Sequence, residues 1–317
     1  MWLIKSEEET DPEYGKRPEE RSLEELIKSS VVIVDKHPGP TSHQITQWTK
    51  EIFGVKKAGH AGTLDPAVTG VLPVALGNAT KAMPVLMGLE KEYVGVMHLH
   101  KEVPEDLLRE VTSSFVGKIV QVPPVKSAVA RRPREREIKF FDIVEREGKD
   151  VLFHVGCEAG TYIRKLVHQI GERLGVGAHM TELRRIRVGN FKEEQAHSLV
   201  EIRDAYEFWK NGNEKKLREI LIPIEHAILH VKKIFVKDSA IDSICHGAPL
   251  FVSGITRIQE GIARGETVAI YSLKEELVAL GIAKMTSEEM YEKNKGLAVR
   301  TDRVLMEKGV YPKKSSR

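Results

Sequence analysis

The segment at residues 59–81, GHAGTLDPAVTGVLPVALGNATK, constrains this chain more than any other part of it. It contains four glycines and a lone acidic residue, Asp65, which stands directly before Pro66. Glycine lets a backbone approach a ligand closely, and the proline biases Asp65 toward an extended conformation. The apolar run at 71–76 then predicts a buried strand. We therefore expect a loop over 54–68 that presents one carboxylate beside a sheet, although Asp-Pro is also a common turn dipeptide.

Hydrophobic periodicity predicts both strands and helices before residue 230. Strands are expected at 31–35, 71–76, 91–100, 118–122, twice within 138–158, and at 179–191. Helices are expected at 42–53, 79–89, 104–115, 161–174 and within 198–220. Ser42 is the expected capping residue of the first of these helices. Most of the chain before residue 230 is therefore expected to form one large domain that mixes the two kinds of element.

The pattern of apolar residues and glycines in the sequence changes near residue 231. Short β-rich runs separated by regularly spaced glycines follow, which is typical of a small β-barrel. We place a first domain at 31–230, a second at 231–312 and a disordered tail at 313–317. Residues 1–30 hold nine acidic and five basic side chains and form a separate N-terminal extension.

The net charge of +3 hides an uneven distribution. Residues 118–139 hold seven Lys or Arg and two Glu, and a long basic loop is expected at 122–137. Such a cluster attracts polyphosphate chains, which favours a nucleic acid as partner, although a solvated loop is the other interpretation. The two distant cysteines, Cys157 and Cys245, and the lack of a long apolar run predict a cytoplasmic protein without a disulfide framework.

Two further residues are candidates for a functional site. Thr161 is the expected cap of the helix at 161–174, and Arg164 then lies in its first turn, where a cation opposes the helix dipole. We hypothesise that Arg164 faces a carboxylate, unless the helix begins elsewhere. Tyr93, on the strand at 91–100, either stacks on a base or packs in the core.

These segments together resemble the pseudouridine synthase family that includes the bacterial tRNA T-loop enzyme and dyskerin. The motif at 59–81 resembles the signature of that family, and KHPGPTSH, KEYVGV, QVPPVKSAV, EAGTYIRKLVHQIG and GAHMTELRRIRVG resemble its further motifs in the same order. Residues 231–310 resemble the PUA RNA-binding domain. The full-sized second domain and the acidic extension are similar to the archaeal dyskerin-like branch, in which that extension packs with the PUA domain.

The resemblance implies an α+β fold, with a large, mostly antiparallel mixed sheet flanked by helices and a small PUA barrel. It implies that Asp65 is the catalytic carboxylate, that Arg164 pairs with it and that Tyr93 stacks on the flipped uracil. The same resemblance implies contacts with the substrate from His60, Gly62, Thr63, Tyr162 and Leu183. It implies contacts with RNA from Lys126, Arg131, Arg132, Arg134 and Arg184, and from Gly247, Ala248 and Arg264 in the PUA domain.

The resemblance also implies the activity, which is the isomerisation of uridines in ribosomal RNA, and in tRNA as a further substrate, to pseudouridine. The expected protein is the catalytic subunit of a box H/ACA ribonucleoprotein. Its expected partners are the guide RNA, the target RNA, two small ribonucleoprotein subunits and a kink-turn-binding protein. No cofactor or metal is expected, because the reaction involves no redox change. A stand-alone tRNA T-loop synthase and a non-catalytic RNA-binding scaffold remain alternatives.

Overall fold

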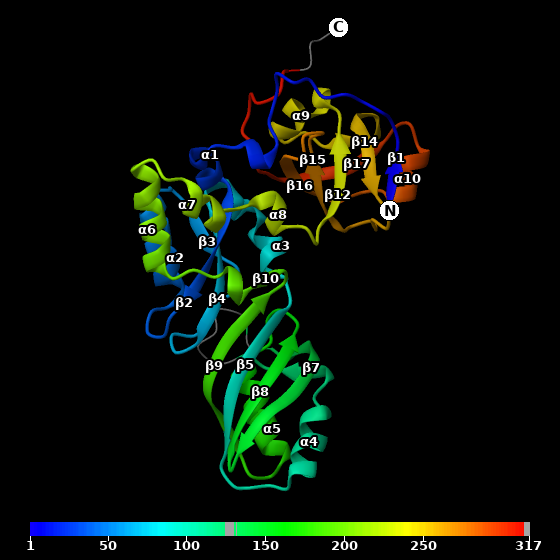
Figure 1. Ribbon diagram of the computed structural model, residues 1–317. Helices are drawn as coiled ribbons and strands as arrows, with labels where there is room; N and C mark the ends of the chain where they lie inside the picture. Colours follow the sequence, from blue (N-terminus) through cyan, green and yellow to red (C-terminus); the bar gives the residue numbers. More distant parts are fainter. Residues whose placement is uncertain (124–129, 131, 314–317) are drawn as a thin grey trace.

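The computed structural model describes residues 1–123, 130 and 132–313. Within them the strands form two sheets, one of ten strands and one of seven (Figure 1). The smaller sheet contains both the first strand of the chain and the last, so the two ends of the sequence meet in one domain. No helix in these residues is long and apolar enough to span a bilayer.

The ten-stranded sheet has the order β11-β2-β4-β9-β5-β8-β7-β6, with β3 added beside β4 and β10 beside β9. The pair β4–β9 is parallel and the other named pairs are antiparallel, which confirms the expected α+β fold. Its strands are β2 Ser30–Lys36, β3 Ala58–His60, β4 Thr69–Leu76, β5 Lys91–Leu99, β6 Gly117–Gln121, β7 Arg134–Glu147, β8 Asp150–Cys157, β9 Ala178–Val188, β10 Phe191–Lys192 and β11 Ile222–Pro223.

Helices cover this sheet in two groups (Figure 1). One group, with α2 and α6, packs beside β2 and β4, and the other, with α4 and α5, packs beside β7 and β9. The burial of β5 alternates strictly along its length, as expected for a strand with one face in the core. The helical elements are η1 Pro18–Glu20, α1 Leu23–Lys28, α2 Ser42–Phe53, η2 Gly77–Ala82, α3 Met83–Met87, α4 Glu105–Ser113, α5 Ile163–Arg173, η3 Glu193–Gln195, α6 Leu199–Lys210, α7 Lys215–Ile220 and α8 Ile224–Ala227.

Three regions differ from the sequence-based expectation. The helix expected at 79–89 is a 3-10 segment followed by the short α3, because Pro84 has no amide hydrogen and fits only the start of a helix. The loop expected at 54–68 contains β3, whose three residues are too few to show a period. The basic loop expected at 122–137 ends at β7, whose first four residues, Arg134 to Glu137, are all charged and so carry no apolar alternation.

The seven-stranded sheet has the order β1-β14-β12-β15-β16-β17-β13. It surrounds a core of its own, in which Ile234, Val268, Val278 and Val299 are fully buried. Gly281 lies in β16 where a Cβ would overlap the side chain of Val299, so this position requires glycine for space. The elements are β1 Trp2–Ile4, β12 Lys232–Val236, α9 Asp238–Cys245, β13 Leu250–Phe251, η4 Val252–Gly254, β14 Ile255–Gln259, β15 Thr267–Tyr271, β16 Leu277–Ala283, α10 Ser287–Glu292 and β17 Leu297–Val304.

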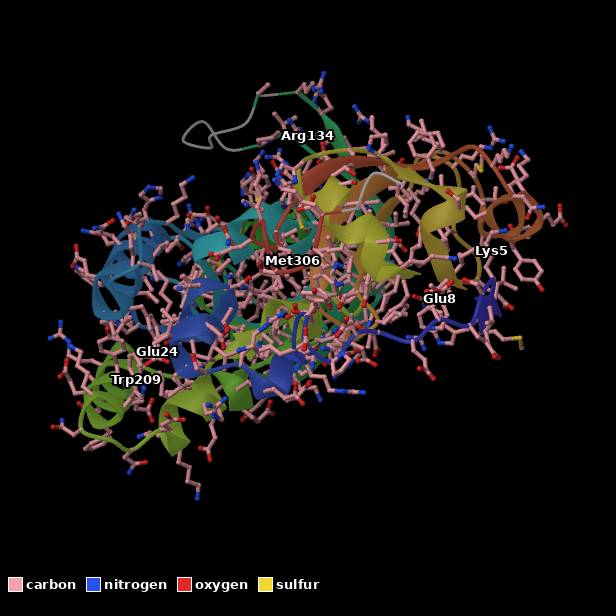
Figure 2. All side chains as sticks on the ribbon, turned by 90° about the horizontal axis from the view of Figure 1, so that it is seen from above. Lys5, Glu8, Glu24, Arg134, Trp209 and Met306 are labelled. Carbon is pink, nitrogen blue, oxygen red and sulfur yellow. The ribbon has the colours of Figure 1, made fainter. Side chains whose placement is uncertain are left out.

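The N-terminal segment contacts both domains. Its strand β1 pairs with β14, and Glu8 forms an ion pair of 2.6 Å with Lys237, so Lys5 and Glu8 lie beside the seven-stranded sheet (Figure 2). Further along the segment, Leu23 of α1 is fully buried in the core of the larger domain, together with Val32 and Ile45. The extension therefore connects the two sheets as well as packing against the smaller one.

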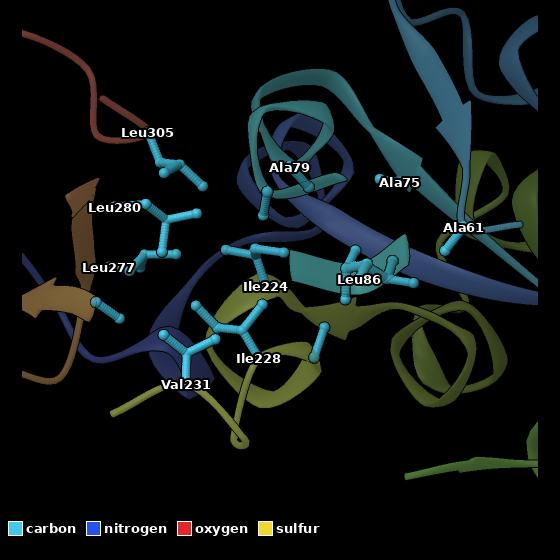
Figure 3. Close-up of a cluster of buried hydrophobic side chains, with 14 of the residues drawn as sticks. Ala61, Ala75, Ala79, Leu86, Ile224, Ile228, Val231, Leu277, Leu280 and Leu305 are labelled. Atoms are coloured by element: carbon cyan, nitrogen blue, oxygen red, sulfur yellow. The ribbon is translucent and has the colours of Figure 1, made fainter. Parts of the chain in front are cut away.

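The junction between the domains is a shared apolar core (Figure 3), next to which Arg21 and Glu225 form a buried ion pair. Side chains of the larger domain, such as Ile224 and Ile228, pack in one cluster with Leu277 and Leu280 of the smaller domain. The two terminal guanidinium nitrogens of Arg21 donate to the Glu225 carboxylate, at 2.9 and 3.1 Å. The amide of Leu277 donates to the same carboxylate at 2.9 Å, so this group joins the N-terminal segment, α8 and β16.

Arg21→Met is expected to lower the free energy of unfolding by about 3–5 kcal/mol, because it leaves the Glu225 carboxylate buried without its cation. The double variant Arg21→Met/Glu225→Gln should recover most of this loss, since an amide has no charge to compensate. Guanidinium denaturation measures both, with the exposed Arg203→Met on α6 as the control. Equal losses for the single and double variants would contradict this role of the ion pair.

Candidate active site

Asp65 lies on a loop between β3 and β4, and Arg164 lies at the start of α5. The Arg164 guanidinium donates to the Asp65 carboxylate. Both side chains remain about half exposed, at 60% for Arg164 and 52% for Asp65. The pair is therefore accessible from solution, and it joins the two groups that the sequence analysis had connected by hypothesis.

Ser42 holds the loop from one side. Its hydroxyl accepts from the amide of Leu64 at 2.8 Å and donates to the carbonyl of the same residue at 3.0 Å. The cap of α2 is Thr41, whose side chain accepts from the Gln44 amide, and not Ser42 as expected. Ser42 is the first helical residue, so its fully buried hydroxyl is free to bind the loop instead.

Lys36 holds the loop from the end of β2, on the buried side of the loop. Its ammonium group donates to the carbonyls of Pro66 and Val68 at 2.8 Å each and to that of His37 at 3.0 Å. The residue is fully buried, and its burial lowers the pKa of Lys36, an effect that the nearby Asp65 opposes. The ammonium group thus donates hydrogen bonds to loop carbonyls that are not paired with a neighbouring strand.

Arg185 holds a third point of the loop. It is 1% exposed, and its guanidinium donates to the carbonyl of Val71 at 2.8 Å and to that of Gly62 at 3.1 Å. Arg185 lies opposite Tyr93 in the β5–β9 register. Burial lowers the pKa of Arg185 and raises the pKa of Tyr93. The tyrosine ring, 8% exposed, thereby has a buried cation as its neighbour.

His60 connects the loop to α2. The Thr46 hydroxyl donates to the Ser42 carbonyl at 2.8 Å, so at its 3.0 Å contact with His60 Nδ1 it accepts. We therefore assign the hydrogen to Nδ1, which leaves Nε2 to accept from the Thr63 hydroxyl at 3.3 Å. Burial, with the charges of His43 and Arg185, lowers the pKa of His60, which favours the neutral imidazole over its protonated form.

The start of α5 is fixed by Gln121. Its side-chain amide accepts from the Tyr162 backbone N–H at 2.9 Å and donates to the Tyr162 carbonyl at 3.2 Å. The cap position of α5 is Tyr162, and Thr161, the expected cap, instead donates to the Glu158 carbonyl. Arg164 still lies in the first turn, where Asp65 supplies the negative charge that the helix dipole favours.

The remaining candidates of the larger domain include Leu183 and the basic residues of the segment that leads into β7. Leu183 is partly buried and packs against the same apolar cluster as Tyr93 and Leu64. Lys126 and Arg131 lie outside the described residues, whereas Arg132 is exposed next to β7 and Arg134 is partly buried at its start (Figure 2).

Two of the arginines expected to contact RNA are bonded within the protein. Arg184 binds Asp35 and Glu193, each at 2.9 Å, and Arg264 is paired with Glu289. The carboxylates therefore compete with any phosphate for these side chains.

The PUA candidates Gly247 and Ala248 belong to the second domain, away from Asp65. Gly247 follows His246, the residue that ends α9, with a positive φ of 87°, a conformation that favours glycine, and a Cβ there would meet only open space. The Ala248 carbonyl accepts from the Thr301 hydroxyl at 2.7 Å.

The chain matches four protein-family models in sequence order. These are the DKCLD domain at 1–46, the N-terminal domain of TruB family pseudouridylate synthases at 50–163, the tRNA pseudouridylate synthase B C-terminal domain at 164–229, and the PUA domain at 232–305. Among curated relatives, the probable tRNA pseudouridine synthase B of Methanopyrus kandleri is 55% identical, covering 98% of this chain and 92% of the relative. The chain belongs to the TruB family of pseudouridine synthases.

Solved structures of this family cover almost the whole chain. The crystal structure of a Cbf5-Nop10-Gar1 complex matches with a TM-score of 0.93 at 52% identity, over 99% of this chain and 96% of the other. The structure of an H/ACA RNP bound to a substrate RNA containing 2′-deoxyuridine matches with a TM-score of 0.92 at 50% identity, over 99% and 97%. The fold and the enzyme class, an RNA pseudouridine synthase, are thereby confirmed.

Several residues of this synthase site were missed by the sequence analysis. Lys36, Ser42 and Arg185 bind the loop, and Gln121 fixes α5, yet none stands out in the sequence. Arg185 is one of three arginines within four residues of β9, and strand alternation does not single it out, because it gives Arg185 and Arg187 the same parity although only Arg185 is buried.

Lys91 is a further buried cation near the site. Its ammonium donates to the carbonyls of Met87 at 2.7 Å and Leu89 at 2.5 Å, behind Gly62 of the loop. Burial lowers the pKa of Lys91 to about 8, and burial raises the pKa of its cross-strand neighbour Cys157 to about 11. The interior beneath the loop thus disfavours charge, although the basic side chains of Lys36, Lys91 and Arg185 are all buried there.

Ser42→Ala is expected to lower kcat by about 10- to 100-fold with a small change in KM, because the Leu64 amide and carbonyl lose their partner and Asp65 is held less firmly. Steady-state kinetics measures both constants. The matched control is Ser113→Ala, on the exposed face of α4. An unchanged kcat in Ser42→Ala would show that the loop does not need this anchor.

The lowered pKa of Lys91 predicts how the unfolding free energy depends on pH. Its pKa in the folded protein, about 8, lies below the ordinary value of 10.5, so between these pH values the unfolded chain binds more protons. The unfolding free energy of wild type relative to Lys91→Met should therefore rise as the pH increases through this window. Chemical denaturation across the window measures it, and the contribution of Cys157 largely cancels in the comparison. A constant or falling difference would contradict the burial of a charged Lys91.

Proposed function

We propose that this chain is the catalytic subunit of a guide-RNA-dependent pseudouridine synthase, with Asp65 as its catalytic carboxylate. The observation that carries the proposal is the half-exposed Asp65–Arg164 pair on a loop that buried side chains hold at several points. A carboxylate that is accessible and yet fixed can act as a nucleophile or a base without moving first.

The reaction breaks the bond between N1 of uracil and C1′ of ribose, turns the base, and forms a bond from C5 to C1′. The proton on C5 is lost and N1 gains one, so atoms balance without an oxidant or a metal. Asp65 would assist this exchange at the sugar or at the base, and Arg164 would orient its carboxylate. Tyr93 would stack on the uracil, since base–aromatic contacts contribute about 1–3 kcal/mol per base.

The target uridine must leave its stack before Asp65 can reach it, which costs a few kcal/mol. We assign to His60, which bonds to Thr63 within the loop, the role of helping to displace the target base. Gly62, Tyr162 and Leu183 would line the space around the uracil. Of the described arginines near the basic segment, Arg132 and Arg134 would contact the RNA, because Arg184 is already bound to two carboxylates.

Dependence on a guide is supported by the similarity to H/ACA structures over nearly the full length of both chains. In this proposal the partners are a box H/ACA guide RNA, its target RNA, two small ribonucleoprotein subunits and a kink-turn-binding protein. The PUA domain would hold the end of the guide RNA, with Gly247 and Ala248 as contacts, and Arg264 would join them by exchanging its partner Glu289 for a phosphate. A stand-alone activity on tRNA is the second candidate, favoured by the names of the curated relatives.

Release of tritium from C5-labelled uridine tests the proposal. We expect release from a guide-matched target in the presence of guide and partners, and at least about 1,000-fold less in Asp65→Asn, because an amide can neither attack nor accept the proton. The control is Asp204→Asn, an exposed position on α6. Release from an isolated T-loop RNA alone would favour the stand-alone enzyme, and bound RNA without release would favour a scaffold.

A further inference from the structure

A hollow of about 620 Å³ lies beside the catalytic loop, between α2, β3 and α3. Its volume is within the range of pockets that hold one small organic molecule, and a single nucleotide is of that size. His60 lines the hollow from β3, while Lys50 and His43 line it from α2. None of the assigned roles of Asp65, Tyr93 or Arg164 uses this space.

The charge of the hollow is strongly one-sided. Lys50, Lys56 and Lys57 line it, and none of its described lining residues is acidic. None of the three lysines forms an ion pair with a described carboxylate, in contrast to Lys118 or Lys237 elsewhere on the surface. Glu51 on the adjacent turn of α2 accepts instead from Gln47 at 2.8 Å. Three unneutralised ammonium groups around one hollow favour a phosphate.

The rest of the lining suits a base or a ribose. Met83 and Met87 of α3 form an apolar side, and Met87 is 52% exposed although it is a large apolar side chain. The thioether of methionine is flexible and polarisable, so it adapts to flat ring surfaces. The His43 ring stands edge-on to His60, with centroids 5.9 Å apart. An anion site next to exposed apolar and ring surfaces therefore matches a nucleotide better than inorganic phosphate.

His60 connects the hollow to the reaction centre. One ring nitrogen contacts Thr46, and the other contacts Thr63, two residues before Asp65. A group bound in the hollow therefore touches a side chain that is itself hydrogen-bonded to the catalytic loop. This shared wall places the hollow next to the target uridine rather than at a remote RNA contact.

We propose that this hollow binds the nucleotide of the target strand that adjoins the uridine, with its phosphate at Lys50, Lys56 and Lys57 and its base against Met87 and His43. This inference rests on the proposed function, because it takes Asp65 to mark the position of the target uridine. It adds a second binding site to the substrate strand, in which interactions with the neighbouring nucleotide position the uridine.

The test is the triple variant Lys50→Gln/Lys56→Gln/Lys57→Gln in the complete guided complex. We expect KM for the target RNA to rise about tenfold or more with kcat within about twofold, since these ammonium groups bind the substrate strand and not the reacting atoms. The slope of log Kd against log salt should become shallower by about 0.7 for each phosphate that the variant no longer neutralises. The matched control is Lys101→Gln/Lys149→Gln/Lys215→Gln, which removes three exposed lysines elsewhere.

Target RNAs that lack one base, on the 5′ or the 3′ side of the uridine, provide the second arm. Wild type should bind one of them about tenfold more weakly than intact target, because that RNA has no base to stack in the hollow. A His43→Ala/Met87→Ala variant should show no such difference. The proposal is overturned if KM and the salt slope are unchanged in the triple lysine variant. It is also overturned if each modified RNA loses the same affinity for wild type as for the His43→Ala/Met87→Ala variant.

Binding and turnover are measured separately so that the two proposals can fail separately. If wild type binds the guided target without releasing tritium, the proposed catalysis is wrong, and the salt slope still decides whether the lysines contact RNA. If wild type turns over normally and the triple variant behaves like its control, the nucleotide site is wrong and the enzyme assignment stands. Unchanged thermal unfolding of the variants establishes that each is folded.

Discussion

The hydrogen bonds that hold the loop at 61–68 are the constraint on which the rest of the site depends. Asp65 must be open to a large substrate, so it cannot be fixed by burial of its own side chain. The loop backbone is bound instead, by the ammonium of Lys36, the hydroxyl of Ser42 and the guanidinium of Arg185. Each comes from a different element, and each group is buried, so the loop stays fixed while its carboxylate faces solution.

Buried cations are normally paired with carboxylates, because an isolated charge is costly inside a protein. Here Lys36 and Arg185 bind backbone carbonyls instead, and Arg185 also lies beside Tyr93. Neither cation forms an ion pair with a described carboxylate, so their positive charge is available close to the place where RNA phosphates and a developing negative charge would lie. Burying these cations without paired carboxylates costs stability. Such a cost is common at functional sites, where a rule of folding is broken for the sake of activity.

The junction between the sheets also depends on one group that binds several elements. The carboxylate of Glu225 accepts from Arg21 of the N-terminal segment and from the Leu277 amide of the smaller domain. Around it the apolar side chains of both domains share one core (Figure 3). The PUA domain is therefore held against the larger domain rather than tethered by a linker, which gives an RNA bound to both a defined path.

The sequence by itself determined the strands and helices with clear periodicity, the family motifs, and the identities of Asp65, Tyr93 and Arg164 as candidates. These depend on local patterns, which one chain displays directly. Only the tertiary structure decided that Ser42 binds Leu64 rather than capping its helix, that Arg184 is occupied while Arg185 is buried, and that three lysines surround a hollow behind His60. Hydrogen-bond partners and burial arise between elements distant in sequence, so neighbouring residues of the same type become distinct only after the chain has folded.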